Sequence, residues 1–444
     1  MRVRKRGSKS WGNTTNLATQ KDPVYQGWRI KIFVATWLGY AAFYFTRKAF
    51  SVAKIGLSAD PSIGFDNDTL AFIDAAYLAA YMFGQFFWGP LGDRFGPRRI
   101  VIFGMLCSVL AAIFSGFSTT FFFFALFSVL QGLAQSTGWA PLTKNISTWF
   151  SFRERGRVMG WWCTNYAIGG LIASPFAGLM AGAYFFNDWR YAFFMPALVL
   201  LLVAVLFYII QRDKPEDVGL LPIEDYQGEA RRDVTPSAGP ASQQGESWRI
   251  ICEVLKNKTV WALALVYFFL KPTRYAILFW GPKYINEQFG SGVTESSFIS
   301  AIFELGGPLG ALLSGYVSDK LFKSKRMPVI IIPLAALAVV LFFFNHFALS
   351  GKMAVGILFF LIGLFVYGPD SLISGTAAID FGTKRGAGTA AGFINGMGSL
   401  GAVLGGSLPG IVAMRWGWGG VFTSLAVSTL FAAILLIPFW KKVP

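Results

Sequence analysis

Two arginines, Arg47 and Arg274, lie deep inside long apolar runs of the chain, 227 residues apart. They are the sixteenth residue of the run from Ile32 to Leu57 and the fifteenth of the run from Val260 to Ile285. A charged side chain in the middle of a bilayer costs about 2.5 to 3.5 kcal/mol even on lenient insertion scales. Because a planar guanidinium presents paired N–H donors that match two oxygens of a phosphate, the pair predicts a site for an oxyanion.

A second pattern repeats at almost the same distance. The segment GPLGDRFGPRR from Gly89 is followed 226 residues later by GYVSDKLFKSKR from Gly315. Two related halves are therefore expected, each with one buried arginine. In each loop a turn, an acid and a basic run occur together, which favours a gating and charge network over a merely positive inner loop. The candidate residues of this gating and charge network are Asp93, Arg94, Arg98 and Asp319.

The composition predicts an all-α integral membrane protein. The 444 residues are 54% hydrophobic and 14% charged, and apolar runs of roughly 20 residues recur along the chain, as membrane-spanning helices require. Twelve such runs are expected in two pseudo-symmetric six-helix halves, and the absence of strand-like alternation disfavours a β-barrel. The expected regions are a basic tail (1–28), an N-terminal half (29–211), a linker (212–257) and a C-terminal half (258–444).

The net charge of +16 could indicate nucleic-acid binding, but the positions of the basic residues argue against it. If both termini are cytoplasmic, 29 of the 39 Lys and Arg residues lie on the inner side. By the positive-inside rule this bias predicts a protein of the cytoplasmic (inner) membrane with that orientation. The linker is rich in charge, Pro, Gly and Ser, and is expected to be mobile. Five basic residues fall on the outer side: Lys54, Arg190, Lys283, Lys352 and Arg415.

No constellation typical of an enzyme, a cofactor site or a metal site is present in the sequence. It lacks a phosphate-binding GxxxxGK[ST] loop, and no nucleophile stands beside a base. The three cysteines lack the spacing of zinc ligands. The single histidine, His346, is expected near an outer helix end as an exposed bystander.

Several motifs together make the chain similar to a known family. They are GYAAFYFTRK around Arg47, GLAQSTGWAPLTK (132–144), FRERG (152–156), RDKPEDVGLLPIEDY (212–226), FELGG (303–307) and KRGAGTAAGF (384–393). The chain resembles the organophosphate:phosphate antiporter family of the major facilitator superfamily. The resemblance implies the major facilitator fold. It also implies that Arg47 and Arg274 bind the phosphate of substrate and counter-substrate, with Tyr40 and Tyr44 near the pocket.

Three departures from the family pattern are informative. Tyr166 stands where bacterial members typically carry a cavity histidine, so a histidine cannot be protonated there during turnover. Gln85 replaces a lysine of bacterial relatives. Lys271, one turn before Arg274, matches a lysine of the eukaryotic sugar-phosphate exchanger branch. The candidate substrate contacts therefore include three further residues beside the two arginines and Tyr40 and Tyr44. These are Lys271, Tyr166 and Asn165.

Buried acids are expected to balance part of this charge. Asp74, Glu304, Asp370 and Asp380 lie in spans or at their ends, where an unpaired carboxylate is expensive. Glu304 is expected either to latch a cation when the site is empty or to form a static ion pair. Asp74 and Lys271 are candidates to neutralise each other. Lys48 and Lys144 are expected to pair elsewhere, Lys144 within the inner-face network.

The leading functional hypothesis is a secondary transporter. It would exchange an organic phosphate, such as glycerol-3-phosphate or a hexose phosphate, for inorganic phosphate by alternating access. No nucleic-acid partner is expected, and the protein is expected to work as a monomer in the lipid bilayer. Two alternatives stay open: a membrane sensor of external sugar phosphate, and a carrier of another organic anion.

Overall fold

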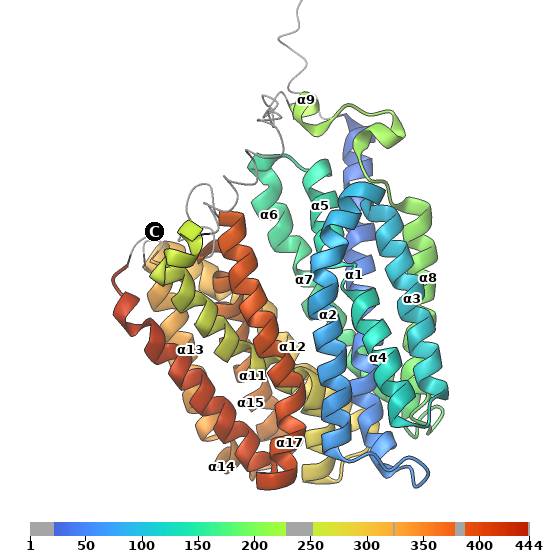
Figure 1. The fold of residues 1–444 in the computed structure, drawn as a ribbon, viewed down its shortest axis with the longest axis vertical. Coiled ribbons are helices and arrows are strands. Elements are labelled where there is room, and N and C mark those ends of the chain that lie inside the picture. Colours follow the sequence, from blue (N-terminus) through green and yellow to red (C-terminus); the bar gives the residue numbers. More distant parts are fainter. Residues whose placement is uncertain (1–21, 228–251, 323–324, 378–386, 443–444) are drawn as a thin grey trace, which may run out of the picture.

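The computed structural model describes residues 22–227, 252–322, 325–377 and 387–442. Figure 1 shows a bundle of long helices, with the N-terminal half in blue and green and the C-terminal half in yellow to red. Seven helical stretches of the described residues are long and apolar enough to cross a membrane. The segments in these ranges are helical, with no strand among them, which agrees with the all-α fold expected from the sequence.

The N-terminal half is built from eight helices, in which α4 with α5, and α6 with α7, follow each other closely enough to form single crossings. Their bounds are α1 Pro23–Ala59, α2 Asn67–Phe95, α3 Pro97–Phe117, α4 Phe121–Gln135, α5 Trp139–Trp149, α6 Phe152–Trp162, α7 Thr164–Ala181 and α8 Tyr191–Ile210. Side-chain caps fix where the first two begin. Asp22 accepts the Val24 N–H at 2.9 Å, and Asp66 accepts the Thr69 N–H at 2.9 Å.

The C-terminal half has a comparable set of helices. Their bounds are α11 Lys258–Phe289, α12 Val293–Tyr316, α13 Arg326–Phe342, α14 Phe344–Ala348, α15 Lys352–Ser371 and α17 Ala387–Leu436. The π-helical segments Val317–Leu321 and Leu372–Ala377 extend α12 and α15, and a short 3-10 turn, Ile437–Phe439, follows α17. Gly417 interrupts α17 with a φ of 67°, so α17 forms two crossings. This grouping is consistent with six crossings in each half.

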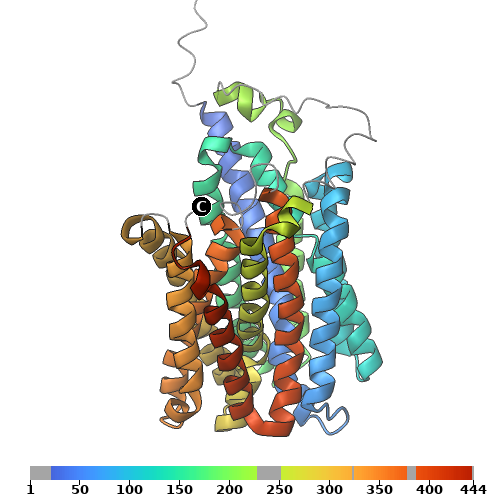
Figure 2. The same ribbon diagram turned by 60° about the vertical axis from the view of Figure 1, so that its left-hand side comes forward.

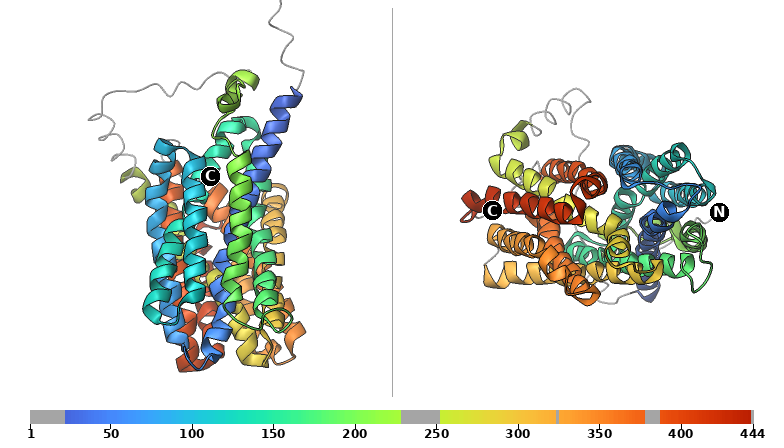
Figure 3. Two further views of the ribbon diagram at one scale, coloured as in Figure 1. Left: turned by 90° about the vertical axis from the view of Figure 1, so that its right-hand side faces the viewer. Right: turned by 90° about the horizontal axis from the view of Figure 1, so that it is seen from below.

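The two halves meet mainly at one end of the bundle. We call the end with Pro23 and Phe439 the terminal end, and the end with the turn between α1 and α2 the far end. Buried residues from both halves, including Val52, Leu78 and Trp280, form one shared hydrophobic cluster toward the far end. Figure 1 shows the ribbons of the two halves diverging toward the terminal end, Figure 2 shows the same helices from another side, and the right-hand view of Figure 3 shows the two sets of helices side by side.

Close approach of α2 and α17 depends on glycine. A Cβ on Gly406 would lie 2.4 Å from Leu78 Cδ1, and one on Gly410 would lie 2.4 Å from the backbone oxygen of Asn67. Both contacts are far shorter than van der Waals distance, so no larger residue fits without movement. The Gly-rich stretch of α17 therefore lets the halves pack closely, at Gly406 against a side chain of α2 and at Gly410 against its backbone.

The first part of the linker is fixed to the N-terminal half, in contrast to the mobile linker that its composition predicts. It contains a 3-10 turn, Pro215–Val218, and a short helix, α9 Ile223–Gln227. Tyr226 stacks on Tyr25 with ring centroids 3.8 Å apart, and Asn145 Nδ2 donates to the Asp213 carbonyl at 3.0 Å. Residues 228–251 lie outside the described residues.

Candidate anion-binding site

The N-terminal arginine is surrounded by neutral groups. Arg47 lies on α1 and is 7% exposed. Its Nε donates to Gln135 Oε1 at 2.9 Å, and its guanidinium carbon lies 4.6 Å from the Tyr44 ring centroid and 4.9 Å from that of Tyr81. Tyr77 donates to the same Gln135 oxygen at 2.6 Å. Among the described residues Arg47 Nη2 has no hydrogen-bond partner although it is buried, so this donor is free for an anion.

The C-terminal arginine has a different environment because a carboxylate faces it. Arg274 lies on α11 and is 8% exposed. Its Nη1 donates to Asp370 Oδ2 at 3.1 Å, and Lys271 Nζ lies 3.0 Å from the other oxygen of this carboxylate. The Tyr367 ring lies 4.5 Å and the Tyr166 ring 5.3 Å from the guanidinium carbon. The buried Nε of Arg274 has no partner in the described part of the chain.

The two environments meet across the interface between the halves. Tyr166 on α7 stacks on Tyr367 on α15, with centroids 6.1 Å apart and planes 9° apart. Tyr367 donates to Glu304 Oε2 at 2.6 Å, and Lys48 Nζ lies 3.6 Å from Glu304 Oε1. Tyr166 and Lys48 of the N-terminal half thus lie against Arg274 and Glu304 of the C-terminal half. An anion at this point could therefore contact both halves at once.

The charges of this centre do not cancel. Among the described residues, four cationic side chains face two carboxylates, which leaves two positive charges in excess when all are ionised: Arg47, Lys48, Lys271 and Arg274 against Glu304 and Asp370. Buried charges of one sign are unfavourable unless a ligand balances them. The arrangement is thus suited to an anion with two negative charges.

Comparison with known proteins identifies the fold and the family. Residues 36–406 match the sequence pattern of the Major Facilitator Superfamily. A probable hexose phosphate transport protein of Chlamydia trachomatis is 33% identical, with 94% of this chain and 92% of that protein covered. The chain belongs to the major facilitator superfamily, and within it to the organophosphate:phosphate antiporter family.

Other members of the superfamily agree with this assignment. A glycerol-3-phosphate transporter of Bacillus subtilis is 32% identical, with 95% of each chain covered. A membrane sensor protein of Escherichia coli is 31% identical, with 94% of this chain and 93% of that protein covered. The crystal structure of a bacterial homologue of the human lysosomal transporter Spinster has a TM-score of 0.69 at 15% identity, covering 94% and 96%. This facilitator is therefore a multi-pass membrane protein of a transporter fold.

The remaining substrate-contact candidates of the facilitator lie in two places. Tyr40 is buried in an aromatic cluster of the N-terminal half. Its ring centroid lies 5.4 Å from that of Trp139 and 5.6 Å from that of Trp162. Asn165 on α7 is fully buried, and neither its Nδ2 nor its Oδ1 has a partner among the described residues. This amide offers one donor group and one acceptor to a polar ligand.

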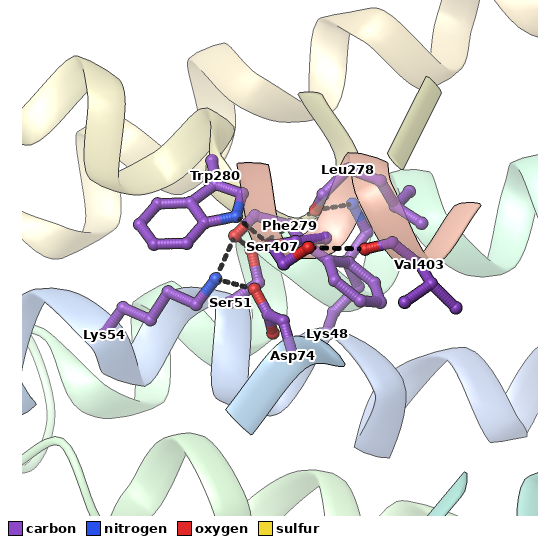
Figure 4. Close-up of polar contacts among 10 residues, drawn as sticks. Lys48, Ser51, Lys54, Asp74, Leu278, Phe279, Trp280, Val403 and Ser407 are labelled. Carbon is purple, nitrogen blue, oxygen red and sulfur yellow. Dashed lines mark hydrogen bonds and ion pairs between the residues drawn. The ribbon is translucent and has the colours of Figure 1, made fainter. Parts of the chain in front are cut away.

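The structure corrects the pairing expected for Asp74. Its partner is Lys54, with which it forms a buried ion pair (Figure 4). Lys271 pairs with Asp370 instead. The sequence also placed Lys54 and Lys283 among the outer basic residues, but both are buried at the interface. Each has a polar partner, since Lys283 Nζ donates to Ser58 Oγ at 2.7 Å. These pairings keep the two lysines inside the bundle.

The expected gating network is only partly visible. The side chains of Asp93 and Asp319, and the whole of Asp380, lie outside the described residues. Arg94 is exposed, and Arg98 donates its backbone N–H to Asp213 Oδ1 at 2.7 Å, so this end of α3 is tied to the linker. His346 is exposed at the end of α14, as expected of a bystander.

Four neighbours of the site were not predicted from the sequence. Gln135, Tyr77, Tyr81 and Tyr367 contact the arginines or the groups that hold them. A neutral glutamine in a glycine-rich stretch carries no charge signal, and tyrosines are common in this aromatic chain. Their chemistry becomes evident only when the helices that carry them are placed together.

Proposed function

We propose that this facilitator exchanges an organic phosphate for inorganic phosphate by alternating access. The observation that carries the proposal is the pair of buried arginines at equivalent positions of the two halves, each with a nitrogen that lacks a partner in the described chain. A phosphoryl group offers three oxygens, so one guanidinium from each half can bind it while the organic part extends away.

The excess charge supports both the ligand and the exchange. Phosphate monoesters carry about −1.5 to −2 charges at neutral pH, which matches the two uncompensated positive charges of the centre. Without an anion, closing the halves around the site would desolvate those charges. The empty carrier is then slow to change its access, whereas inorganic phosphate and an organic phosphate both permit the movement. This difference makes transport an obligatory exchange.

The contacts to the organic part follow from the surroundings of the arginines. The Asn165 amide can hydrogen-bond sugar or glycerol hydroxyls, and Tyr40, Tyr44 and Tyr166 supply aromatic walls. Lys271 is a third cation, and it can bind the phosphoryl group once its ammonium separates from the Asp370 carboxylate. The relatives named for hexose phosphate and glycerol-3-phosphate support these two classes of substrate.

The membrane arrangement is part of the proposal. The protein acts as a monomer in the cytoplasmic (inner) membrane, with its terminal end in the cytoplasm and its far end outside. Glu304 and Asp74, with Asp93, Arg94, Arg98 and Asp319, form the charge network that changes partners during the movement. The contacts at the far end correspond to a state closed to the outside.

Counterflow in proteoliposomes tests the proposal. Vesicles loaded with unlabelled phosphate should accumulate radiolabelled phosphate, and glycerol-3-phosphate or glucose-6-phosphate should compete. Arg47→Lys and Arg274→Lys should each reduce the rate about 100-fold, because a lysine cannot offer paired N–H donors. Arg190→Lys, at an arginine of the far end whose ion pair is with Asp188, is the control. Full exchange by either buried-arginine variant would exclude the two-arginine site.

A sensor of external sugar phosphate is the second candidate, favoured by the similarity to the Escherichia coli membrane sensor protein. A sensor would bind radiolabelled sugar phosphate without supporting counterflow. A carrier of another organic anion would show inhibition by carboxylates rather than by phosphate esters. The same vesicles distinguish the three functions.

A further inference from the structure

The far end of the interface contains two backbone carbonyls that face the opposite half. Pro282 of α11 has no N–H, so the carbonyl of Leu278, four residues earlier, has no helical partner there. Lys48 Nζ donates to this oxygen at 3.0 Å. The neighbouring Phe279 carbonyl accepts from Ser51 Oγ at 2.9 Å and from Lys54 Nζ at 3.1 Å. Pro282 thus accounts for the free Leu278 carbonyl, and the Phe279 carbonyl beside it also faces α1.

The ammonium group of Lys54 is enclosed by groups that bind cations. It contacts the Asp74 carboxylate of α2 and the Phe279 carbonyl of α11, and it lies 3.7 Å from the Trp280 ring centroid (Figure 4). Trp280 is itself fixed by its Nε1, which donates to the Gly406 carbonyl of α17 at 2.8 Å. A carboxylate, a peptide oxygen and an aromatic face together form a complete cation site.

We infer that the two halves form a small cation-binding site at the far end, occupied by the chain's own Lys54 ammonium, and that this occupancy keeps the far end closed. Asp74 belongs to the same half as Lys54, so it positions the ammonium. The contacts of Lys54 that join the halves are those with the Phe279 carbonyl and the Trp280 ring, both on α11. Opening the far end breaks these contacts and leaves the ammonium with Asp74 alone.

The site lies next to the proposed phosphate site. A small cavity of about 30 Å³ is lined by Arg47 as well as by Ser51, Asp74 and Phe279, and it has room for about two water molecules. Gln131 lines the same cavity, and its buried Oε1 has no partner in the described residues. Movement of the Arg47 guanidinium toward a bound anion therefore changes the surroundings of the Lys54 site directly.

The inference rests on the alternating access of the proposed function, but its test measures accessibility and needs no phosphate. Ser297 of α12 is fully buried against Gly178 of α7, on the opposite half. In a background without the three native cysteines, Ser297→Cys reports opening of the far end. The reaction rate with a polar maleimide is measured in lipid nanodiscs. Loss of exchange without a change in labelling would argue against the exchange function, not against this site.

Lys54→Ala empties the site and should speed labelling by tenfold or more. Ethylammonium should restore slow labelling because it supplies a charge with N–H donors. Tetramethylammonium has the charge but no donor, so it should not. Lys352→Ala, which removes an ion pair to Glu295 within the C-terminal half, is the matched control and should label at the parental rate. Failure of ethylammonium to slow the reaction, or equal rescue by both cations, would overturn the cation site.

A second variant covers the case in which Lys54→Ala does not fold, because it leaves Asp74 as an unpaired buried charge. Lys54→Met combined with Asp74→Asn removes both charges while keeping each side chain close to its original volume, and it leaves no unpaired buried charge. It also removes the donor to Phe279, so labelling should again be at least tenfold faster than in the parent. Labelling at the parental rate by this folded double variant would overturn the inference.

Discussion

The surroundings of Arg47 and of Arg274 differ although the two residues occupy equivalent positions in related halves. Arg47 contacts an amide oxygen and tyrosine rings, whereas Arg274 shares Asp370 with Lys271. The repeat has thus preserved the position of the guanidinium but not its counter-charge. We expect Arg47 to supply most of the attraction for an anion, and Arg274 to bind it only in competition with Asp370.

The largest effect should come from neutralising each arginine in turn. Arg47→Gln should weaken phosphate binding about 100-fold, because it removes a cation that no carboxylate of the described residues pairs with. Arg274→Gln should weaken it only about tenfold, since Lys271 is still available nearby. Equilibrium binding of radiolabelled phosphate to purified protein measures both. Equal losses would show that the asymmetry of charge has no effect on affinity.

Removing the counter-charge should have the opposite sign. Asp370→Asn frees both Arg274 and Lys271, so phosphate should bind about tenfold more tightly while exchange becomes slower through delayed release. Binding and counterflow are measured on the same preparation. Asp188→Asn, at an acid of the far end paired with Arg190, should change neither. Weaker binding by Asp370→Asn would mean that Asp370 serves to orient Arg274.

Lys271→Met should have a smaller effect, about fivefold weaker binding. Without the lysine, the Asp370 carboxylate pairs with Arg274 only, and the centre loses one of its two excess positive charges. The combination of Lys271→Met with Asp370→Asn should recover most of the affinity. The double variant loses one positive and one negative charge, so the excess positive charge of the centre is that of the unmodified protein. An affinity as low as that of Lys271→Met alone would contradict a shared carboxylate.

The smallest effect is expected at the position where bacterial relatives typically have a histidine. Tyr166→Phe keeps the stack on Tyr367 and the ring beside Arg274, so phosphate binding should change less than twofold. Exchange should likewise keep its rate when measured by counterflow. A loss of tenfold or more would show that the hydroxyl, rather than the ring, contacts the substrate.

Much of the fold and part of the site could be predicted from the sequence. The apolar runs and the repeat spacing correctly predicted helices in two halves, and the equal depth of Arg47 and Arg274 predicted that both would be buried. Helical periodicity also predicted that Lys271 lies beside Arg274. Such features depend on one helix or on a regular repeat, which the sequence records directly.

Pairings between distant helices could not be predicted in this way. Lys54 lies near the end of an apolar run, which is typical of an outer-side lysine, and only the position of Asp74 and of the Phe279 carbonyl shows that it is buried. The same holds for Asp370, 96 residues from Arg274. Which acid neutralises which base depends on helix packing, and several acids were available to each.

The docking of the first linker segment also affects how such a protein is made. Residues up to Gln227 already include the partners of Tyr25 and Asn145, so the N-terminal half can complete its terminal surface before α11 has been synthesised. A chain emerging from the ribosome would then present a finished half to the membrane while the second is still being translated. For coexpression as two separate polypeptides, a break after Gln227 should therefore assemble better than one after Gln211.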